Sequence, residues 1–316
     1  MNPLGALYGA AIGLRNGLYD RGTLQARRLQ APVVSIGSIS AGGAGKTPFL
    51  IMLGEILKER GVAFHVLSRG YRRKTKGVRL VDPAGTAAEF GDEPLLIARK
   101  LGVPVIVGED RYAAGRFAEE KFGAQAHLLD DGFQHRRLAR DFDIVLLTQR
   151  DLHDRLLPGG RLREPLSSLA RASALVFIDD AASATTPIRN HQLTWRVRRS
   201  IVPPETKEAC FAFCGIARPE SFFTDLGKAG VRVTGTRAFR DHHAYTAQDV
   251  EALYRQGQRS GATAFATTEK DGVNLGEFAD RLRPLHVAVV RMAFEKDASA
   301  PVERICAVLR GETTHA

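Results

Sequence analysis

A glycine-rich stretch near the start of the chain constrains its fold more than any other feature. The apolar run Pro32–Ile36 precedes it and predicts a buried strand, and the run Phe49–Leu57 follows it and predicts a helix. A strand, a glycine-rich turn and a helix N-terminus form a cradle for phosphate, because glycines let backbone N–H groups approach an anion and the helix end adds partial positive charge. The predicted nucleotide-binding loop consists of Ser40, Ala41, Gly42, Gly43, Ala44, Gly45, Lys46 and Thr47.

The last two residues of this loop have chemical roles in such cradles. Lys46 is expected to reach the β- and γ-phosphates of a nucleotide, and Thr47 is expected to bind Mg2+. The loop departs once from the usual G-x-x-x-x-G-K-[ST] pattern, since Ser40 stands where the first glycine is usual. A glycine-rich turn without a ligand is the alternative, but the flanking strand and helix favour a phosphate site.

A pair of acidic residues supplies the second feature of a nucleotide site. The apolar run from Ala126 predicts a strand that ends in Asp130 and Asp131. Mg2+ prefers oxygen ligands, so one of these carboxylates is expected to hold the ion directly or through water. The two adjacent charges would repel one another unless a cation lies beside them. An acidic turn with no metal is the alternative.

Basic residues follow two other predicted strands, at what we expect to be the same edge of the sheet. A cluster that begins at Ser68-Arg69 follows the strand Val62–Leu67, and Arg111 follows the strand Val103–Val107. Both are well placed to bind phosphate or a polyanionic substrate. A solvated loop is the alternative for the cluster, because runs of charge are usually exposed.

Two further loops carry charged residues. Asp92 stands at the start of the predicted helix Leu95–Leu101, where helix capping alone explains an acidic residue. The proline- and glycine-containing loop 156–165 includes Arg163 and Glu164. An arginine in such a loop can neutralise charge that develops in a transition state.

The alternation of strands and helices predicts a doubly wound α/β/α domain with the glycine-rich loop at its ligand edge. The composition changes over 179–208, where acidic residues, threonines and prolines surround one strand-like run, Gln192–Arg198. A second strand–helix pattern begins at Ala209. We therefore expect an amphipathic helix over 1–30, a P-loop domain over 31–190, a linker over 191–208 and a smaller α/β domain over 209–316.

Two polar stretches end predicted strands of the smaller domain. In the first, His242 and His243 follow Asp241, and a histidine beside an aspartate can form a general base with its orienting acid. An exposed polar turn explains the same residues equally well. The second stretch, Thr267–Asp271, could contact a nucleotide or cap the next helix.

The N-terminal residues and the net charge indicate an anionic partner with apolar parts. Leucines at three-to-four spacing, among them Leu4, Leu7 and Leu14, predict an amphipathic helix that packs on its own domain or lies in a membrane interface. No apolar run is long enough to predict a spanning helix. The net charge of +10 suits nucleic acid, an acidic membrane leaflet or a phosphorylated substrate. Aromatic residues make up only 7% and do not alternate with the basic ones, which disfavours nucleic acid.

Together these motifs resemble one family, the tetraacyldisaccharide 4'-kinases, which are the lipid A 4'-kinases of Gram-negative bacteria. The segments that carry the resemblance are Arg15–Asp20, Gly42–Pro48, Ser68–Tyr71, Gly91–Pro94, Asp130–His135, Leu162–Pro165, Asp241–His243 and Thr268–Asp271. They occur in the family's order and span nearly the whole chain. The family also lacks a glycine at the position of Ser40.

The resemblance implies ATP- and Mg2+-dependent phosphorylation of the 4'-hydroxyl of an acylated glucosamine disaccharide 1-phosphate, which gives lipid IVA in lipopolysaccharide biosynthesis. It also implies two α/β/α domains around a cleft. The enzyme is expected to be a monomer, peripheral on the cytoplasmic face of the inner membrane and bound to its anionic surface. An acylated, anionic substrate would account for the apolar helix and the positive charge together.

The resemblance also implies roles for particular residues. According to the resemblance, Asp92 is the base for the sugar hydroxyl rather than a helix cap. His242 is implied as the partner of Asp92, and His243 is the alternative for this partner role. Because these residues lie on different predicted domains, we expect domain closure to bring them together. The implied ATP and Mg2+ ligands are the loop 40–47, including Lys46 and Thr47, with Asp130 or Asp131 and with Glu164 as a further candidate. The implied phosphate- or substrate-binding residues are Asn16, Arg69, Arg111 and Arg163.

Other functions fit parts of the sequence. A P-loop switch GTPase or ATPase acting on a protein or metal partner is the main alternative, because Thr268–Asp271 faintly resembles a guanine-reading motif. Such a protein would hydrolyse nucleotide without a lipid acceptor and would tolerate the loss of His242. A nucleic-acid-binding ATPase is a second alternative and would show salt-dependent binding.

Overall fold

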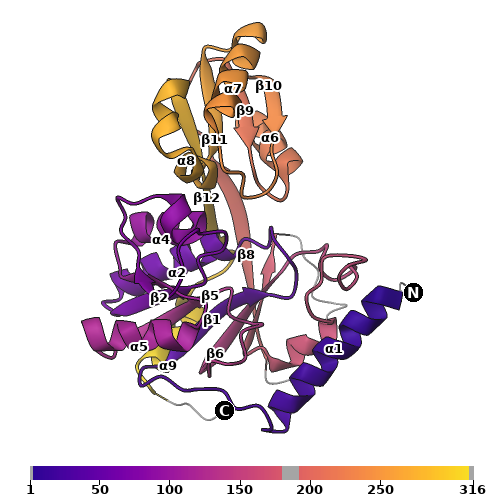
Figure 1. Cartoon of the computed structure of the whole chain (residues 1–316), viewed down its shortest axis with the longest axis vertical. Coiled ribbons are helices and arrows are strands. Elements are labelled where there is room, and N and C mark those ends of the chain that lie inside the picture. Colours follow the sequence, from indigo (N-terminus) through magenta and orange to yellow (C-terminus); the bar gives the residue numbers. More distant parts are fainter. Residues whose placement is uncertain (1–2, 180–191, 313–316) are drawn as a thin grey trace.

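The computed structural model describes residues 3–179 and 192–312 as a larger and a smaller α/β body joined by two long strands (Figure 1). The elements of the larger body up to the gap are α1 (Pro3–Asp20), β1 (Val33–Ser38), α2 (Lys46–Glu59), β2 (Phe64–Ser68), β3 (Arg79–Leu80), α3 (Ala87–Phe90), α4 (Asp92–Leu101), β4 (Val105–Val107), α5 (Arg111–Phe122), β5 (Ala126–Asp130), β6 (Phe142–Leu147), the 3-10 helix η1 (Leu166–Arg171) and β7 (Ala174–Ile178).

The remaining elements form the smaller body and lead back to the larger one (Figure 1). They are β8 (Leu193–Val202), β9 (Cys210–Cys214), α6 (Pro219–Lys228), β10 (Val233–Ala238), α7 (Ala247–Arg259), β11 (Ala264–Thr268), α8 (Glu269–Leu275), the 3-10 helix η2 (Gly276–Leu282), β12 (Leu285–Phe294) and α9 (Ser299–Leu309). Within the described residues one sheet of 12 strands runs through both bodies, in the order β10-β9-β11-β12-β8-β7-β6-β1-β5-β2-β4-β3.

The sheet of the larger body is doubly wound around β1, as the sequence predicts. β1 lies between β5 and β6 and is parallel to both. Alternate residues of a strand face opposite sides, so Val34 and Ile36 pack with α2 and α9 on one face, while Val33 packs with Leu29 and α5 on the other. Helices on both faces bury every residue of β1, which places the loop after it at the carboxyl edge of a rigid sheet.

The structure differs from the predicted division of the chain in two places. Residues 193–202, expected in the linker, form β8, which pairs parallel with β7 and antiparallel with β12. The helix α9, expected in the smaller domain, returns to the larger body. There Val302 and Ile305 are buried in the same core as the apolar residues of α2 and β1. The predicted boundary at residue 190 lies outside the described residues.

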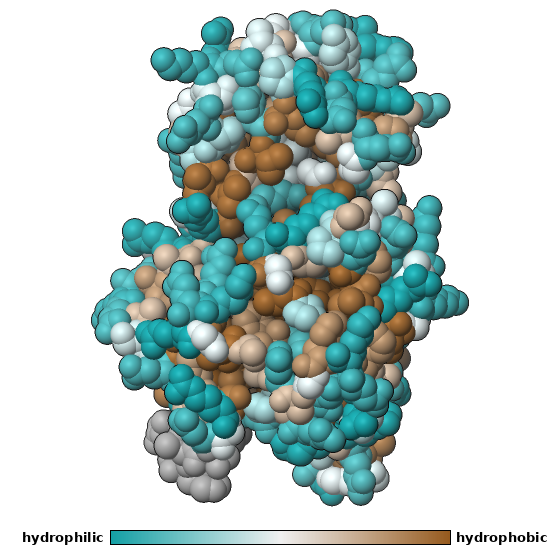
Figure 2. Space-filling view, turned by 90° about the vertical axis from the view of Figure 1, so that its left-hand side faces the viewer, coloured by the Kyte–Doolittle hydropathy of each residue, from teal (hydrophilic) through white to brown (hydrophobic). Residues whose placement is uncertain are grey.

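β8 and β12 form the connection between the bodies (Figure 1). Both are 10 residues long, and their antiparallel pairing extends from Val289–Val202 to Phe294–Val197. Figure 2 shows a narrower waist between the bodies, where hydrophilic side chains gather with hydrophobic ones above and below. The two strands therefore fix where the loops of the smaller body meet the carboxyl edge of the larger sheet.

The N-terminal helix α1 lies along the outside of the larger body (Figure 1). Tyr8 donates a hydrogen bond of 3.0 Å to the carbonyl of Arg163, and Asn16 is buried. Leu4, Leu7 and Leu14 remain exposed, at 63%, 70% and 67% of their surface. One side of the helix is thus docked and another presents leucines. Across the described part of the chain, no helix combines the length and hydropathy needed to cross a bilayer.

Candidate functional site

The glycine-rich loop between β1 and α2 has the backbone of a phosphate cradle. Gly42, Gly43 and Gly45 have φ of 68°, 68° and 70°, a left-handed conformation that glycine adopts without strain. A Cβ at Gly45 would lie 2.3 Å from the Cε of Met292 on β12, so the loop contacts the end of this side chain from the connecting strands. No side chain caps the N-terminus of α2, which leaves its first N–H groups available for an anion.

Lys46 and Asp131 lie together under this loop. The Nζ of Lys46 is 3.5 Å from Asp131 Oδ1 and 3.4 Å from Ser38 Oγ. Arg163 donates to both oxygens of the same carboxylate, at 2.7 and 2.8 Å. Burial alone would raise the pKa of Asp131, but the charges of Lys46 and Arg163 hold it well below its usual range. Asp131 is therefore an anion held between two cations.

Asp130 at the end of β5 has a different environment. It is buried, its Oδ2 accepts a hydrogen bond of 2.8 Å from Ser68 Oγ, and its Oδ1 is buried with no partner. Burial, followed by the negative charges of Glu93 and Asp131, raises the pKa of Asp130 to about 7. A bound cation would reverse this effect. An unpartnered carboxylate oxygen beside a phosphate cradle therefore fits a hard cation such as Mg2+.

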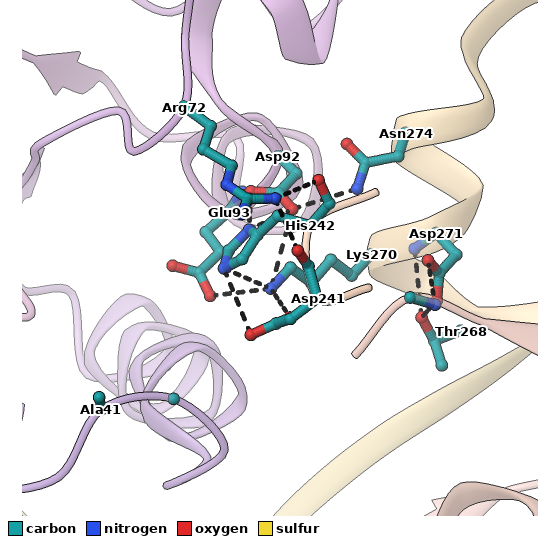
Figure 3. Close-up of polar contacts among 12 residues, drawn as sticks. Ala41, Arg72, Asp92, Glu93, Asp241, His242, Thr268, Lys270, Asp271 and Asn274 are labelled. Carbon is teal, nitrogen blue, oxygen red and sulfur yellow. Dashed lines mark hydrogen bonds and ion pairs between the residues drawn. The ribbon is translucent and has the colours of Figure 1, made fainter. Parts of the chain in front are cut away.

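Asp92, the first residue of α4, lies against a loop of the smaller body. Its Oδ2 is 2.8 Å and its Oδ1 3.1 Å from Nδ1 of His242, and Asn274 donates to Oδ2 at 3.1 Å (Figure 3). Burial would raise the pKa of Asp92, but the hydrogen bond from His242 and the charge of Lys270 lower it overall. The result is a buried, ionised carboxylate that receives hydrogen bonds from the other body.

The geometry also separates the alternatives that the sequence left open for these residues. Gly91 rather than Asp92 is the N-cap of α4, and the backbone N–H that donates to the Asp92 carboxylate is that of the next residue, Glu93, at 2.9 Å. His243 turns away from Asp92, because its Nε2 is 3.0 Å from Asp249 in the capping box of α7. His242, with φ of 57°, is the histidine that meets Asp92.

A cleft of about 850 Å³ lies between the two bodies, and nine of the predicted site residues line it, among them Lys46, Asp131 and His242 but not Asp92. Its acidic residues include Asp130, Asp131 and Glu93, and His242 reaches it from the smaller body. The basic side chains that line it are Arg15, Lys46, Arg69, Arg72, Arg111, Arg136, Arg137, Arg161 and Arg163. Such an excess of positive charge fits a ligand with several phosphates. A second hollow of about 530 Å³ lies on the other side of Lys46 and Thr47, beside α8 and β12.

The structure gives Glu164 and Asn16 a different role from the expected one. Glu164 is fully buried and accepts hydrogen bonds from Asn16 at 2.7 Å, from Gln134 at 3.1 Å and from Arg171 at 3.0 and 3.2 Å. Neither Glu164 nor Asn16 lines the cleft. Neighbouring residues of this loop face opposite sides, so Arg163 points to Asp131 while Glu164 anchors α1. A metal-ligand role for Glu164 and a headgroup contact for Asn16 are therefore not supported.

The sequence did not single out three residues that the site contains. Lys270 and Asn274, both on α8, contact the Asp92–His242 pair (Figure 3). Arg161 donates to the carbonyls of Ala41 and Gly42 at 2.7 and 2.9 Å and so supports the glycine-rich loop. Thr268–Asp271 and the loop 156–165 had marked these regions, but only the three-dimensional arrangement shows which side chains face the site.

Known proteins are similar to this chain over nearly its whole length. A family model described as Tetraacyldisaccharide-1-P 4'-kinase (LpxK) matches residues 1–310. The Tetraacyldisaccharide 4'-kinase of Koribacter versatilis is 48% identical and covers 98% of each chain, and that of Desulfotalea psychrophila is 35% identical and covers 96% of this chain and 95% of its own. A crystal structure of "apo" form LpxK from Aquifex aeolicus in complex with ATP matches with a TM-score of 0.79 and 33% identity, over 97% of this chain and 98% of that one. The chain therefore belongs to the tetraacyldisaccharide-1-P 4'-kinase family and is an ATP-dependent kinase that transfers phosphate to a hydroxyl group.

Proposed function

We propose that Asp92 is the general base that takes the proton from the 4'-hydroxyl of tetraacyldisaccharide 1-phosphate, with His242 holding it in position. The observation that carries this proposal is the contact of 2.8 Å between the two side chains, beside the cleft that contains Lys46. The hydroxyl oxygen bonds to the γ-phosphorus of ATP as the bond from that phosphorus to the β–γ bridging oxygen breaks. The proton passes to Asp92, and ADP leaves with the bridging oxygen.

The phosphates of ATP are assigned to the loop 40–47 and the first turn of α2. The uncapped N–H groups of that helix end and the three glycines with positive φ support this assignment. Lys46 would balance the charge of the transferred group. Thr47, Asp130 and Asp131 are the residues proposed to hold Mg2+, which supplies positive charge to the phosphates when bound. The unpartnered Oδ1 of Asp130 supports its part in this set.

The acceptor carries a 1-phosphate, and the cleft offers cations for it. Arg111 is buried, with one N–H donated to the carbonyl of Glu109 at 2.9 Å, and Arg69 lines the same wall. We assign these two arginines to the anionic group of the acceptor. Arg163 is engaged by Asp131 on both of its terminal nitrogens, so its proposed task is to position that carboxylate.

The acyl chains of the acceptor require an apolar environment, which α1 is proposed to reach. Its exposed leucines, Leu4, Leu7 and Leu14, would enter the acyl boundary of the cytoplasmic leaflet of the inner membrane, with basic residues facing anionic headgroups. Arg15 and Tyr19 of the same helix line the cleft, so the membrane-facing helix borders the substrate site. The protein is proposed to work as a peripheral monomer.

A phosphotransfer assay tests this function. Labelled ATP, Mg2+ and tetraacyldisaccharide 1-phosphate are combined in mixed micelles, and label in the lipid is measured. The expected result is lipid-dependent transfer that Asp92→Ala abolishes and that the matched variant His243→Gln retains. Hydrolysis of ATP or GTP without label in the lipid would favour the switch-type alternative, and full activity of Asp92→Ala would refute the assignment of the base.

A further inference from the structure

Three residues of the motif Thr268–Asp271, which begins at the end of β11, have contacts that stabilise the fold, and the fourth, Lys270, differs from them. Thr268 caps α8 by accepting from the N–H of Asp271 at 3.1 Å. Asp271 is fully buried and accepts from Gly215 N–H at 2.8 Å and from Tyr245 Oη at 2.9 Å. Glu269 forms an ion pair with Lys100 of α4. The side chain of Lys270 takes no part in the cap, in the core of the smaller body or in this ion pair.

Lys270 instead points into the contact between the two bodies (Figure 3). Its Nζ is 3.1 Å from Nε2 of His242 and 3.8 Å from Oδ2 of Asp92. A lysine ammonium has hydrogen-bond donors and no acceptor. Its contact with Nε2 therefore uses the lone pair of that nitrogen, and the ring proton must lie on Nδ1. Nδ1 is the atom that faces Asp92, so the contact selects the tautomer that donates to the carboxylate.

Other charged and polar groups surround this pair. On the Lys270 side, Glu93 is 3.5 Å and Asp241 3.3 Å from Nζ, and Asp241 is also 3.8 Å from Nε2 of His242. On the opposite side, the ring of Tyr71 meets that of His242 edge to face at 5.2 Å. Arg72 donates to the carbonyls of Asp241 and His242, at 2.6 and 2.9 Å.

The ammonium of Lys270 therefore lies within 4 Å of three carboxylates, those of Asp92, Glu93 and Asp241, and of the imidazole of His242. The charges of Glu93, Asp92 and Asp241 outweigh burial and raise the pKa of Lys270, so it stays charged. Its charge in turn contributes to the lowered pKa of Asp92. Asn274, one turn along α8, adds a neutral donor to Asp92. A single short helix thus supplies both the charge and the orientation of the proposed base.

We propose that Lys270 is a positioning residue for the Asp92–His242 pair: its donation to His242 Nε2 fixes the tautomer that donates to Asp92, and its charge favours the ionised carboxylate. This inference rests on the proposed function of Asp92 as the base. Because α8 belongs to the smaller body and α4 to the larger, Asp92 is oriented and kept ionised in this way only when the two bodies are in contact.

The first test is the pH dependence of kcat in Lys270→Met, which keeps the apolar stem and removes the charge. Asp92 must be ionised to act, so activity falls as the pH drops through its pKa, and loss of the Lys270 charge moves this acid limb to higher pH. We expect kcat to fall by about tenfold to a hundredfold, with little change in KM for ATP. Lys270→Arg should return the acid limb toward its original position.

Lys100→Met is the matched control, because it removes a lysine from the same α4–α8 contact without touching Asp92. It should lower stability and leave the acid limb in place. An unmoved acid limb in Lys270→Met would overturn the proposal. A loss confined to KM for ATP would overturn it as well, since Lys270 would then bind the nucleotide rather than position the base.

A second measurement separates this inference from the proposed function. Long-range 1H–15N spectra of histidine-labelled protein report the ring tautomer, and the signal of His242 is assigned by its loss in His242→Gln. The expected result is the Nδ1–H tautomer, which becomes a mixture in Lys270→Met. That result with an active Asp92→Ala variant would refute Asp92 as the base, while the effect of Lys270 on the tautomer of His242 would still stand. An unchanged tautomer in Lys270→Met would refute the role of Lys270 alone.

Discussion

Asp92 and His242 are 150 residues apart in the sequence, yet the carboxylate of one lies 2.8 Å from Nδ1 of the other. Asp92 opens a helix of the larger body, and His242 belongs to a loop of the smaller body. The two side chains are in contact in this structure, and the closing movement expected from the sequence stays a prediction. Their relative position depends on β8 and β12, which carry the chain from one body to the other.

The first prediction concerns Lys46. Replacement by methionine removes the charge beside the phosphate cradle and leaves Asp131 paired with Arg163 alone. We expect kcat to fall by roughly 10²-fold or more, because stabilisation of transferring phosphoryl groups by a fixed cation is of this size. Initial rates of lipid phosphorylation measure it, with thermal unfolding as a check of the fold. Retained turnover would remove Lys46 from the catalytic machinery.

The second prediction tests the structural role of Glu164. Glu164→Gln leaves the guanidinium of Arg171 without its buried partner, so we expect a loss of unfolding free energy of about 3 kcal/mol. The Mg2+ concentration needed for half-maximal activity should not change. Urea unfolding and a Mg2+ titration of activity measure the two quantities. A raised Mg2+ requirement with unchanged stability would restore Glu164 as a metal ligand.

The third prediction concerns stability in acid. His127 is fully buried, 3.5 Å from Glu119 and with its ring 5.3 Å from that of His65. Burial, followed by the neighbouring His65, lowers the pKa of His127 from its ordinary 6.5 to about 4. The unfolded chain therefore takes up a proton before the folded one. Protonation of His127 therefore does not affect the free energy of unfolding above pH 6.5. As the pH falls from 6.5 toward 4, it lowers the free energy of unfolding by about 3 kcal/mol in total.

His127→Gln keeps a donor toward Glu119 but does not titrate, so its stability should depend less on pH between 7 and 4.5. Urea unfolding of both proteins across this range measures the difference. If the two curves of unfolding free energy against pH run parallel, His127 does not contribute to acid sensitivity.

The fourth prediction concerns α1. Leu7→Glu combined with Leu14→Glu places charge on the exposed leucine face and should weaken binding to vesicles of anionic phospholipid by at least tenfold, since each buried side chain contributes about 1.5–3 kcal/mol. Tyr254→Glu is the control, because Tyr254 is an exposed apolar residue on α7 of the smaller body and not on α1. This variant should bind the vesicles as well as the unchanged protein does. Equal sedimentation of all three proteins with vesicles would exclude insertion through these leucines.

The larger body was predictable because its signals are local. The glycine-rich loop, the strand before it and the acidic end of β5 each follow from a short run of residues, and parallel strands bring their carboxyl ends to one edge. The return of α9 to the larger body was not predictable, because its apolar pattern fits either core. The strand-like run Gln192–Arg198 indicated β8, but the prolines and polar residues around it placed it in a linker, and its pairing with β7 and β12 was not predicted.

The site was predictable in its residue types and only partly in its pairings. Capping explained Asp92 from the sequence alone, and the family resemblance moved it to catalysis. His242 and His243 are neighbours with the same chemistry, and only the left-handed backbone at His242 turns one toward Asp92 and the other toward Asp249. Arg163 and Glu164 likewise point in opposite directions, which no spacing rule determines in an irregular loop.

A double-mutant cycle of Asp92→Asn and His242→Gln tests most directly whether the two residues act as one unit across the bodies. Rates of 4'-phosphorylation at saturating ATP, Mg2+ and acceptor are measured for the two single variants and the double variant. We predict that Asp92→Asn lowers kcat by about 10²–10⁴ and that the double variant is no slower, because His242 acts through Asp92. Effects that multiply in the double variant, or an Asp92→Asn enzyme that keeps its kcat, would contradict the account.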